Sequence, residues 1–451
     1  MYANSIIKKT LIISVLHVFI IVITYSQTLI GQTEITKWQF GKKGAVSITY
    51  DDGTINQFRV AIPIMNRLGL PGTFYINTGT LPGSNYLPKF VGRPVSKIIE
   101  ESKTIPTNAD NVLERASAAR YLGYRGTEGY FNRAGGAINS GRMEQAYTIL
   151  DELYKGVANG EFDLLAPNEY AMEYMPQTTE NVLTWDMVKA HASEGHEFAS
   201  HMVTHPYVAA LDDANLKYEV EQSRKEILKQ IGIRHTLSSE LPYGTQNERA
   251  IQYALTVFPV LRNRIAENYV LELHRPSRQT SVNSNYEYVF WERGIVSNTT
   301  LDVMNGWVDT TAMSNNIWLV TVIHGIEGIG WEALTQQTVD AHFSYIKSKE
   351  NDLWVATFAD AARYIKQRMN AKVSSSLKGE KINVKLTHSL HKKLYDTPLT
   401  LKTYVNPEWR MVNAKQGKSV VSVHVQREGA AAFVMYQAMP GGGTIEITAV
   451  R

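Results

Sequence analysis

Short apolar segments alternate along most of the chain with segments whose apolar residues recur at helical spacing. The apolar segments that predict buried strands are GAVSITY (44–50), TFYI (73–76), HEFAS (196–200), IWLVTVI (317–323) and a run at 354–358. The helical spacing predicts helices near 58–68, 185–194, 213–231, 335–348 and 360–369. Strand–helix–strand units require parallel strands joined by right-handed crossovers. The pattern therefore predicts a parallel α/β fold between about residues 41 and 369.

Two regions depart from this rhythm. Residues 81–180 are rich in Gly, Asn and Tyr and predict only two helices, near 111–121 and 142–155. We interpret this stretch as an insertion over one face of the barrel or sheet, where it shapes the cleft. From about residue 373 the pattern changes to strict alternation, which predicts a small antiparallel β-sandwich over 373–451.

The N-terminal segment carries the pattern of a secretory signal peptide. Lys8 and Lys9 precede the apolar run LIISVLHVFIIVIT, and small and polar residues follow up to Gln27. The run is short for a membrane span, which needs about 20 apolar residues, so an uncleaved anchor is the weaker alternative. A secreted eukaryotic protein of this size usually carries disulfides, yet this chain of 451 residues has no cysteine. The expected location is secreted or periplasmic, in a bacterium.

Composition narrows the chemistry further. The 46 basic and 43 acidic residues nearly balance, so no nucleic-acid partner is expected. The absence of cysteine excludes thiol catalysis and thiolate metal sites. A metal site must therefore use His, Asp and Glu, and the nucleophile must be Ser, Thr, Asp or an activated water.

Chemistry-bearing residues follow three of the predicted strands. They are Asp51 and Asp52 in TYDDG, His201 and His205 in SHMVTH, and His324 in VIHG. Active sites of parallel barrels lie at the carboxyl ends of the strands, which is where these residues fall. Each segment also has an ordinary interpretation: a turn for Asp-Asp-Gly, two unrelated histidines for His-x-x-x-His, and a core histidine for His324.

The histidine pair and the aspartate pair suggest different tasks. Pro206 ends any helical turn, so His201 and His205 are expected on a loop, where one carboxylate would complete a three-ligand set for a divalent cation. On an extended backbone Asp51 and Asp52 point to opposite sides. One can then be a metal ligand and the other a base.

Taken in order, these segments resemble the motifs of the polysaccharide deacetylases, carbohydrate esterase family four with its NodB-homology domain. TYDDG is similar to the family's T-F-D-D-G, SHMVTH to its H-S/T-x-x-H, LPYG (241–244) to its third motif, and VIHG to its L-x-x-H. The resemblance covers about residues 41–369 apart from the insertion. It implies a distorted (β/α) barrel, often of seven strands.

The resemblance also implies roles for individual residues. Asp51 would be the general base, and Asp52, His201 and His205 would hold a divalent metal, most often zinc. Tyr243 would offer its backbone N–H to an oxyanion, and His324 would be the general acid. The implied reaction is hydrolysis of an acetyl group, N- or O-linked, on a polysaccharide or oligosaccharide.

Two features of the family pattern are missing. The third motif usually carries an Arg three positions before its Tyr, where this chain has Glu240, so Arg234 or Arg275 is a possible substitute. The fourth motif, an Asp with a Trp, is not recognisable. Asp302, Trp307 and Asp309 lie in its interval, and we interpret Trp307 as a core residue. Trp331 either stacks on a sugar ring or packs as an ordinary aromatic residue.

Two other functions are consistent with the same residues. A catalytically impaired glycan-binding protein on the deacetylase fold would explain Glu240 and the missing fourth motif. A glycoside hydrolase would need two carboxylates about 5–9.5 Å apart across the scissile bond, and adjacent Asp51 and Asp52 with a histidine pair fit metal binding better. Oligomeric state has no signature in the sequence.

Overall fold

The structure, a computed structural model, describes residues 29–166, 182–265, 273–274 and 287–450. The chain divides into two compact units. One unit runs from Ala45 to Ala362. The other combines the residues up to Gly44 with those from Arg363 onward, so a segment from before the parallel fold joins the C-terminal domain. The signal-peptide segment lies outside the described residues.

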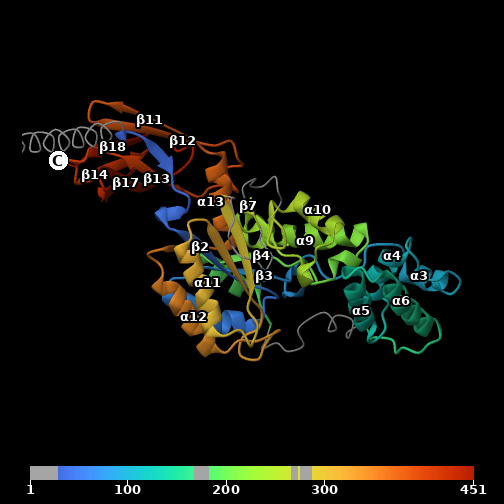
Figure 1. Cartoon of the computed structure of the whole chain (residues 1–451). Helices are drawn as coiled ribbons and strands as arrows, with labels where there is room; N and C mark the ends of the chain where they lie inside the picture. Colours follow the sequence, from blue (N-terminus) through green and yellow to red (C-terminus); the bar gives the residue numbers. More distant parts are fainter. Residues whose placement is uncertain (1–28, 167–181, 266–272, 275–286, 451) are drawn as a thin grey trace, which may run out of the picture. The chain divides into compact units, whose positions relative to one another are not determined.

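A parallel sheet forms the centre of the first unit (Figure 1). In the described part of the chain it has nine strands, ordered β6-β5-β4-β3-β2-β9-β8-β7, with β10 also paired to β2. The strands are β2 (Gly44–Tyr50), β3 (Gly72–Ile76), β4 (Glu197–Ser200), β5 (Ser238–Ser239), β6 (Val260–Leu261), β7 (Leu273–His274), β8 (Tyr288–Gly294), β9 (Ile317–Ile323) and β10 (Leu353–Val355). Every residue of β2, β3, β4 and β9 is buried, which is why these strands are apolar throughout rather than alternating.

Helices connect the strands and cover the sheet, so the architecture is the predicted (β/α) barrel type. They are η2 (Gln57–Ala61), α2 (Ile62–Leu68), α8 (Trp185–Ser193), α9 (Asp213–Ile231), α10 (Glu248–Val257), α11 (Leu301–Met313), α12 (Gln336–Ser348) and α13 (Phe358–Asn370). Two of these helices begin with side-chain caps. The side chains of Thr184 and Asp212 accept hydrogen bonds from the backbone N–H groups of Met187 and Asn215. The strand predicted at 354–358 is shorter, because α13 already begins at Phe358.

The insertion is a group of four helices within its described residues (Figure 1). They are α3 (Val95–Ser102), α4 (Val112–Ala119), α5 (Thr127–Asn139) and α6 (Met143–Ala158). The sequence predicted α4 and α6 but not α3 and α5. These helices share an apolar core with α9 and α10, because Phe131, Leu150 and Val220 belong to one buried cluster. The insertion is therefore packed into the first unit rather than being an independent domain.

The C-terminal unit contains two antiparallel sheets, in agreement with the predicted sandwich. One has the order β1-β13-β17-β16 and the other β11-β12-β18-β14-β15. The strands are β1 (Thr33–Ile35), β11 (Lys372–Lys378), β12 (Lys381–Thr387), β13 (Leu399–Tyr404), β14 (Met411–Gln416), β15 (Ser419–His424), β16 (Gln426–Glu428), β17 (Ala431–Ala438) and β18 (Ile445–Ala449). Strand β1 pairs with β13 across the length of the chain, a contact that the sequence did not predict.

Among the residues that the structure describes, no helix is both long enough and apolar enough to span a membrane.

Candidate active site

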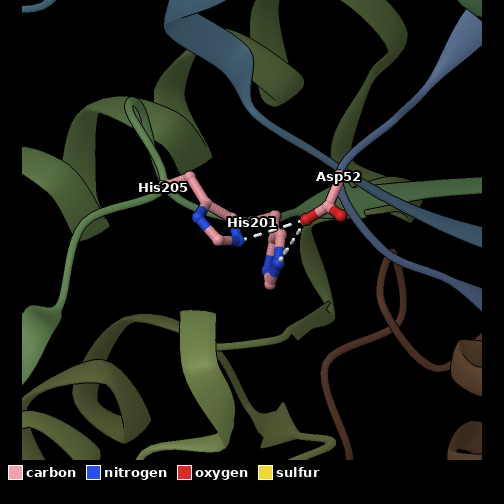
Figure 2. A group of neighbouring side chains, drawn as sticks. All are labelled: Asp52, His201 and His205. Carbon is pink, nitrogen blue, oxygen red and sulfur yellow. Dashed lines mark ion pairs between the residues drawn. The ribbon is translucent and has the colours of Figure 1, made fainter. Parts of the chain in front are cut away.

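Asp52, His201 and His205 lie together at the carboxyl ends of β2 and β4 (Figure 2). Asp52 Oδ1 is 3.1 Å from His205 Nε2 and 3.6 Å from His201 Nε2. One potential ligand atom from each residue falls within 4.8 Å of the other two. The histidines sit on a loop, as Pro206 led us to expect, and the structure brings together the three residues predicted to bind metal.

The geometry fits a divalent cation. His201 Nδ1 lies 2.9 Å from the backbone oxygen of Glu240, an acceptor, so Nδ1 carries the proton and Nε2 is left to face Asp52. A backbone partner on the second ring nitrogen is the usual way a metal-binding histidine is oriented. Burial alone would raise the pKa of Asp52, but the neighbouring imidazoles of His201 and His205 together outweigh burial and lower it, so this carboxylate is ionised. Two imidazoles and a carboxylate suit zinc and related cations.

Backbone strain is concentrated at this site. Asp52, Met202, His205 and Tyr243 all have positive φ angles, between 56° and 73°. Such conformations are uncommon for residues other than glycine, and they persist only where the surrounding structure fixes them. The four residues belong to the loops after β2, β4 and β5, so each loop bends sharply toward the same place.

Asp51 points to a different partner from Asp52. Arg262 donates two hydrogen bonds to the Asp51 carboxylate, of 2.8 Å to Oδ1 and 2.6 Å to Oδ2. Burial would raise the pKa of Asp51, but Arg262, with smaller contributions from His201 and His324, outweighs burial and holds the pKa below its ordinary value. Asp51 is thus a buried, oriented and ionised carboxylate next to the three-residue cluster.

Arg262 is a site residue that sequence reasoning missed. Arg234, one proposed substitute, instead pairs with Asp360 at 2.7 Å, and Arg275, the other, lies outside the described residues. Arg262 follows β6, which pairs with β5, and its guanidinium reaches Asp51 although β6 lies four strands from β2 in the order of the sheet. The available signal was an Arg directly after the short apolar run FPVL.

Glu240, which stands where the family usually has Arg, contacts the same guanidinium. Its Oε1 is 3.2 Å from Arg262 Nη2. Burial raises the pKa of Glu240 to about 7, although Arg262 acts in the opposite direction. The departure at Glu240 therefore does not leave Asp51 without an arginine partner, because Arg262 serves both carboxylates.

His324 follows β9 and approaches Asp51 from the other side. Its Nε2 lies 3.5 Å from Asp51 Oδ2, and burial lowers its pKa. Gln57 ties the two strand ends together, because its Nε2 donates hydrogen bonds to the backbone oxygens of Asp51 (2.6 Å) and His324 (2.8 Å). Gln57 belongs to the π-helical turn η2, and no motif in the sequence pointed to it.

The residues considered for the fourth motif have other contacts. Asp309 accepts a hydrogen bond from Tyr345 and pairs with Lys349, and Asp302 lies in the first turn of α11. Trp307 packs against the core as predicted. It also lines the active-site cavity, and the Arg293 guanidinium lies 5.7 Å from its ring centroid. His324 Nδ1 is buried and has no hydrogen-bond partner within the described part of the chain.

One cavity of about 890 Å³ is lined by the site residues Asp51, Asp52, His201, His205, Arg262 and His324. Tyr243, 44% exposed, stacks on Tyr207 with ring centroids 3.7 Å apart and an interplanar angle of 7°. Trp331, 58% exposed, meets His324 edge-on at 4.8 Å. The insertion contributes Asn139, Ser140 and Arg142 to the wall, in agreement with the expectation that it shapes the cleft.

Comparison with known proteins bears directly on this arrangement. The model of the polysaccharide deacetylase family matches residues 145–257, a stretch that contains the second and third motifs. The predicted resemblance to the polysaccharide deacetylases is confirmed. The match supports a hydrolase of the carbohydrate deacetylase class, as the sequence predicts.

Individual relatives are distant. A gellan lyase from Bacillus sp is 24% identical over 271 residues, which are 57% of this chain and 11% of that protein, so the chain spans about a tenth of that relative's length. Solved structures with partial similarity include a putative polysaccharide deacetylase from Mycobacterium smegmatis (11% identity, 74% of this chain and 93% of that one, TM-score 0.34). A family 4 carbohydrate esterase from Streptomyces lividans is 12% identical over 69% of this chain and 91% of that one, with a TM-score of 0.30.

Proposed function

We propose that the protein is a metal-dependent deacetylase that removes N- or O-linked acetyl groups from a polysaccharide or oligosaccharide. One observation carries the proposal: the Asp52–His201–His205 cluster, the Asp51–Arg262 pair and His324 all line the same cavity. The family match supports carbohydrate deacetylation, and the arrangement supports a hydrolytic route without a covalent intermediate.

Asp52, His201 and His205 would hold the cation, and zinc fits their donor atoms best. A bound cation supplies Lewis-acid polarisation of a water and of the acetyl carbonyl. All of the remaining tasks fall to the chain's own side chains and backbone.

Asp51 is the proposed general base. Arg262 keeps its carboxylate ionised and fixed, so one oxygen can accept a proton from the attacking water. His324 is the proposed general acid for the departing amine or alcohol. Because burial keeps this imidazole neutral near pH 7, it needs a proton during turnover, and Asp51 Oδ2 at 3.5 Å is placed to pass one on.

Tyr243 is the proposed oxyanion donor, through its backbone N–H. Tyr243 has a left-handed conformation at φ 60° within η7 (Pro242–Gly244) and lines the cavity. A fixed N–H donor aimed at developing negative charge is a strong catalytic device. Trp331 offers an exposed indole face on which a sugar ring can stack.

The proposed setting is the periplasm or the exterior of a bacterial cell, where acetylated glycans occur. The N-terminal apolar run and the lack of cysteine support this location. No partner beyond the glycan is proposed.

The test is acetate release from a panel of N- and O-acetylated glycans. Release should stop after treatment with a chelator, return with Zn²⁺, and fall by a factor of about 10² to 10⁴ in Asp51→Asn. Release that survives metal removal, or full activity in Asp51→Asn, would contradict the proposal. Asp213→Asn, on the exposed first turn of α9, is the matched control and should keep full activity.

A glycan-binding protein without catalysis remains the second candidate, because no described residue gives His324 Nδ1 the partner that a fourth-motif Asp would supply. Zn²⁺-loaded protein that binds glycans but releases no acetate from any of them would favour this function over the first.

A further inference from the structure

A buried carboxyl group, that of Glu219, accepts hydrogen bonds from the loop between His201 and His205. Met202 and His205 have φ angles of 69° and 56°, so the loop departs from both helical and extended backbone at these two positions. Glu219, on α9 and only 4% exposed, accepts hydrogen bonds from the backbone N–H groups of Val203 (2.8 Å) and Thr204 (2.9 Å). Its second oxygen accepts from the Thr204 hydroxyl at 2.6 Å.

The same hydroxyl accepts a hydrogen bond from an arginine of the insertion. Arg120, which follows α4 and is 5% exposed, donates from Nη1 to Thr204 Oγ1 at 2.6 Å, and from Nη2 to Glu128 at 3.0 Å. The Thr204 hydroxyl has one proton, which goes to Glu219, and its lone pair faces Arg120. Thr204 therefore joins a buried carboxyl group of the barrel to a buried guanidinium of the insertion.

The other edge of the loop is held by neutral hydrogen bonds from the segment after β3, including one from the Thr78 hydroxyl to the backbone oxygen of Met202 at 3.3 Å. Thr78 and Gly79 donate their N–H groups to the backbone oxygens of Met202 (3.0 Å) and Val203 (2.9 Å). The two edges differ in kind: β3 and its loop supply neutral bonds, whereas Glu219 and Arg120 supply charge-assisted bonds, which are the stronger class.

We propose that Glu219 and Arg120 are positioning residues that set the metal affinity of the site by fixing the His201–His205 loop before the cation binds. The inference rests on the proposed function in taking this cluster as the metal site. It gives the insertion a second role besides lining the cavity, because Arg120 couples α4 to the metal-binding loop. A loop strained at two positions gains most from such support, since any relaxation would move one imidazole away from the other.

The experiment measures Zn²⁺ affinity by competition with a chromophoric chelator, the absorption spectrum of the Co²⁺-loaded protein, and the melting temperature of the metal-free protein. Thr204→Val keeps the shape of the side chain but removes the hydroxyl, and Thr204→Ser restores it. Glu219→Gln removes the charge. Glu226→Gln is the matched control, because Glu226 is also a buried carboxylate on α9, yet it bonds Asn85 instead of the metal-site loop.

We expect Thr204→Val and Glu219→Gln to weaken Zn²⁺ binding by about tenfold to a hundredfold and to alter the Co²⁺ spectrum. Thr204→Ser should stay within about twofold of wild type, and Glu226→Gln should lower the melting temperature without changing affinity. Equal losses of affinity in Glu226→Gln and Glu219→Gln, or unchanged affinity in Thr204→Val, would overturn the proposal. So would a wild-type protein that binds no Zn²⁺.

These outcomes separate the two proposals. Tight, hydroxyl-dependent Zn²⁺ binding with no acetate release would contradict only the deacetylase function. Acetate release with Zn²⁺ affinity that is the same in all four variants would contradict only the positioning role.

Discussion

Arg262, which follows β6, donates hydrogen bonds of 2.8 and 2.6 Å to the two carboxylate oxygens of Asp51, which follows β2. The guanidinium also lies 4.9 Å from the centroid of the Tyr75 ring and 3.2 Å from Glu240. Its planar fork matches a carboxylate in a way that an ammonium group does not. The orientation of the proposed base therefore depends on a residue 211 positions away in the chain.

Arg262→Lys should reduce kcat for acetate release by a factor of about ten to a hundred, because a lysine cannot hold both oxygens of Asp51. The measurement is steady-state kinetics on whichever glycan the wild type deacetylates. Arg234→Lys, at an exposed arginine paired with Asp360, is the control and should leave kcat unchanged. An Arg262→Lys enzyme with wild-type kcat would show that Asp51 does not need the two hydrogen bonds from Arg262.

Gln57→Met should lower kcat about tenfold, because it removes both donors that hold the carbonyls of Asp51 and His324. It should also cost about 1–3 kcal/mol in the free energy of unfolding, since two buried acceptors lose their partner. Gln367→Met in the C-terminal unit is the matched control, because Gln367 is equally buried and donates a hydrogen bond to the backbone oxygen of Thr397. This variant should lose stability but keep the wild-type kcat. Equal kinetics in the two variants would refute the bridging role.

Trp331→Ala should raise KM about threefold to tenfold with little change in kcat, because an exposed indole that stacks on a sugar contributes to binding of substrate and transition state alike. Trp331→Phe should raise KM by a smaller factor than Trp331→Ala. A large fall in kcat instead would show that the edge contact with His324 at 4.8 Å matters for the chemistry rather than for binding.

His342 should make the protein less stable as the pH falls from about 6.5 to about 4. Burial lowers its pKa to about 4 from the ordinary value of 6.5. Between these pH values His342 is therefore protonated in the unfolded chain but not in the folded chain. By linkage, stability is fully present above the unfolded pKa and is lost on acidification, by up to about 3 kcal/mol.

Denaturant unfolding at several pH values checks this expectation. His342→Gln should flatten the fall in stability, although His196, whose pKa burial also lowers to about 4, will retain its own share. A variant with the same pH dependence as the wild type would assign the acid sensitivity elsewhere.

The strands at 44–50 and 317–323 were predictable because their burial on both faces forces continuous apolar sequence. The residues after them follow from the same logic, since parallel strands deliver their carboxyl ends to one edge. Asp51, Asp52, His201, His205 and His324 could therefore be named from the sequence, and the structure places all five in one cavity.

Helix α5 shows why part of the insertion was not predictable. Three glycines in TEGYFNRAGGAIN resemble a loop, yet the segment is helical. A Cβ atom at Gly135 would lie 2.7 Å from the Tyr207 side chain, so glycine is required there by close packing, not by a turn. Local propensity cannot show such a requirement, because it arises from a residue 72 positions away.

The sequence by itself determined the parallel fold, the C-terminal sheets and the residues able to hold a metal, because each depends on periodicity or on local spacing. Only the tertiary structure decided that Arg262 replaces the arginine missing at Glu240, that Gln57 joins two strand ends, and that Glu219 supports the histidine loop. Those roles are hydrogen bonds between distant parts of the chain. They leave no periodic trace, because one buried donor or acceptor can be supplied from any neighbouring element.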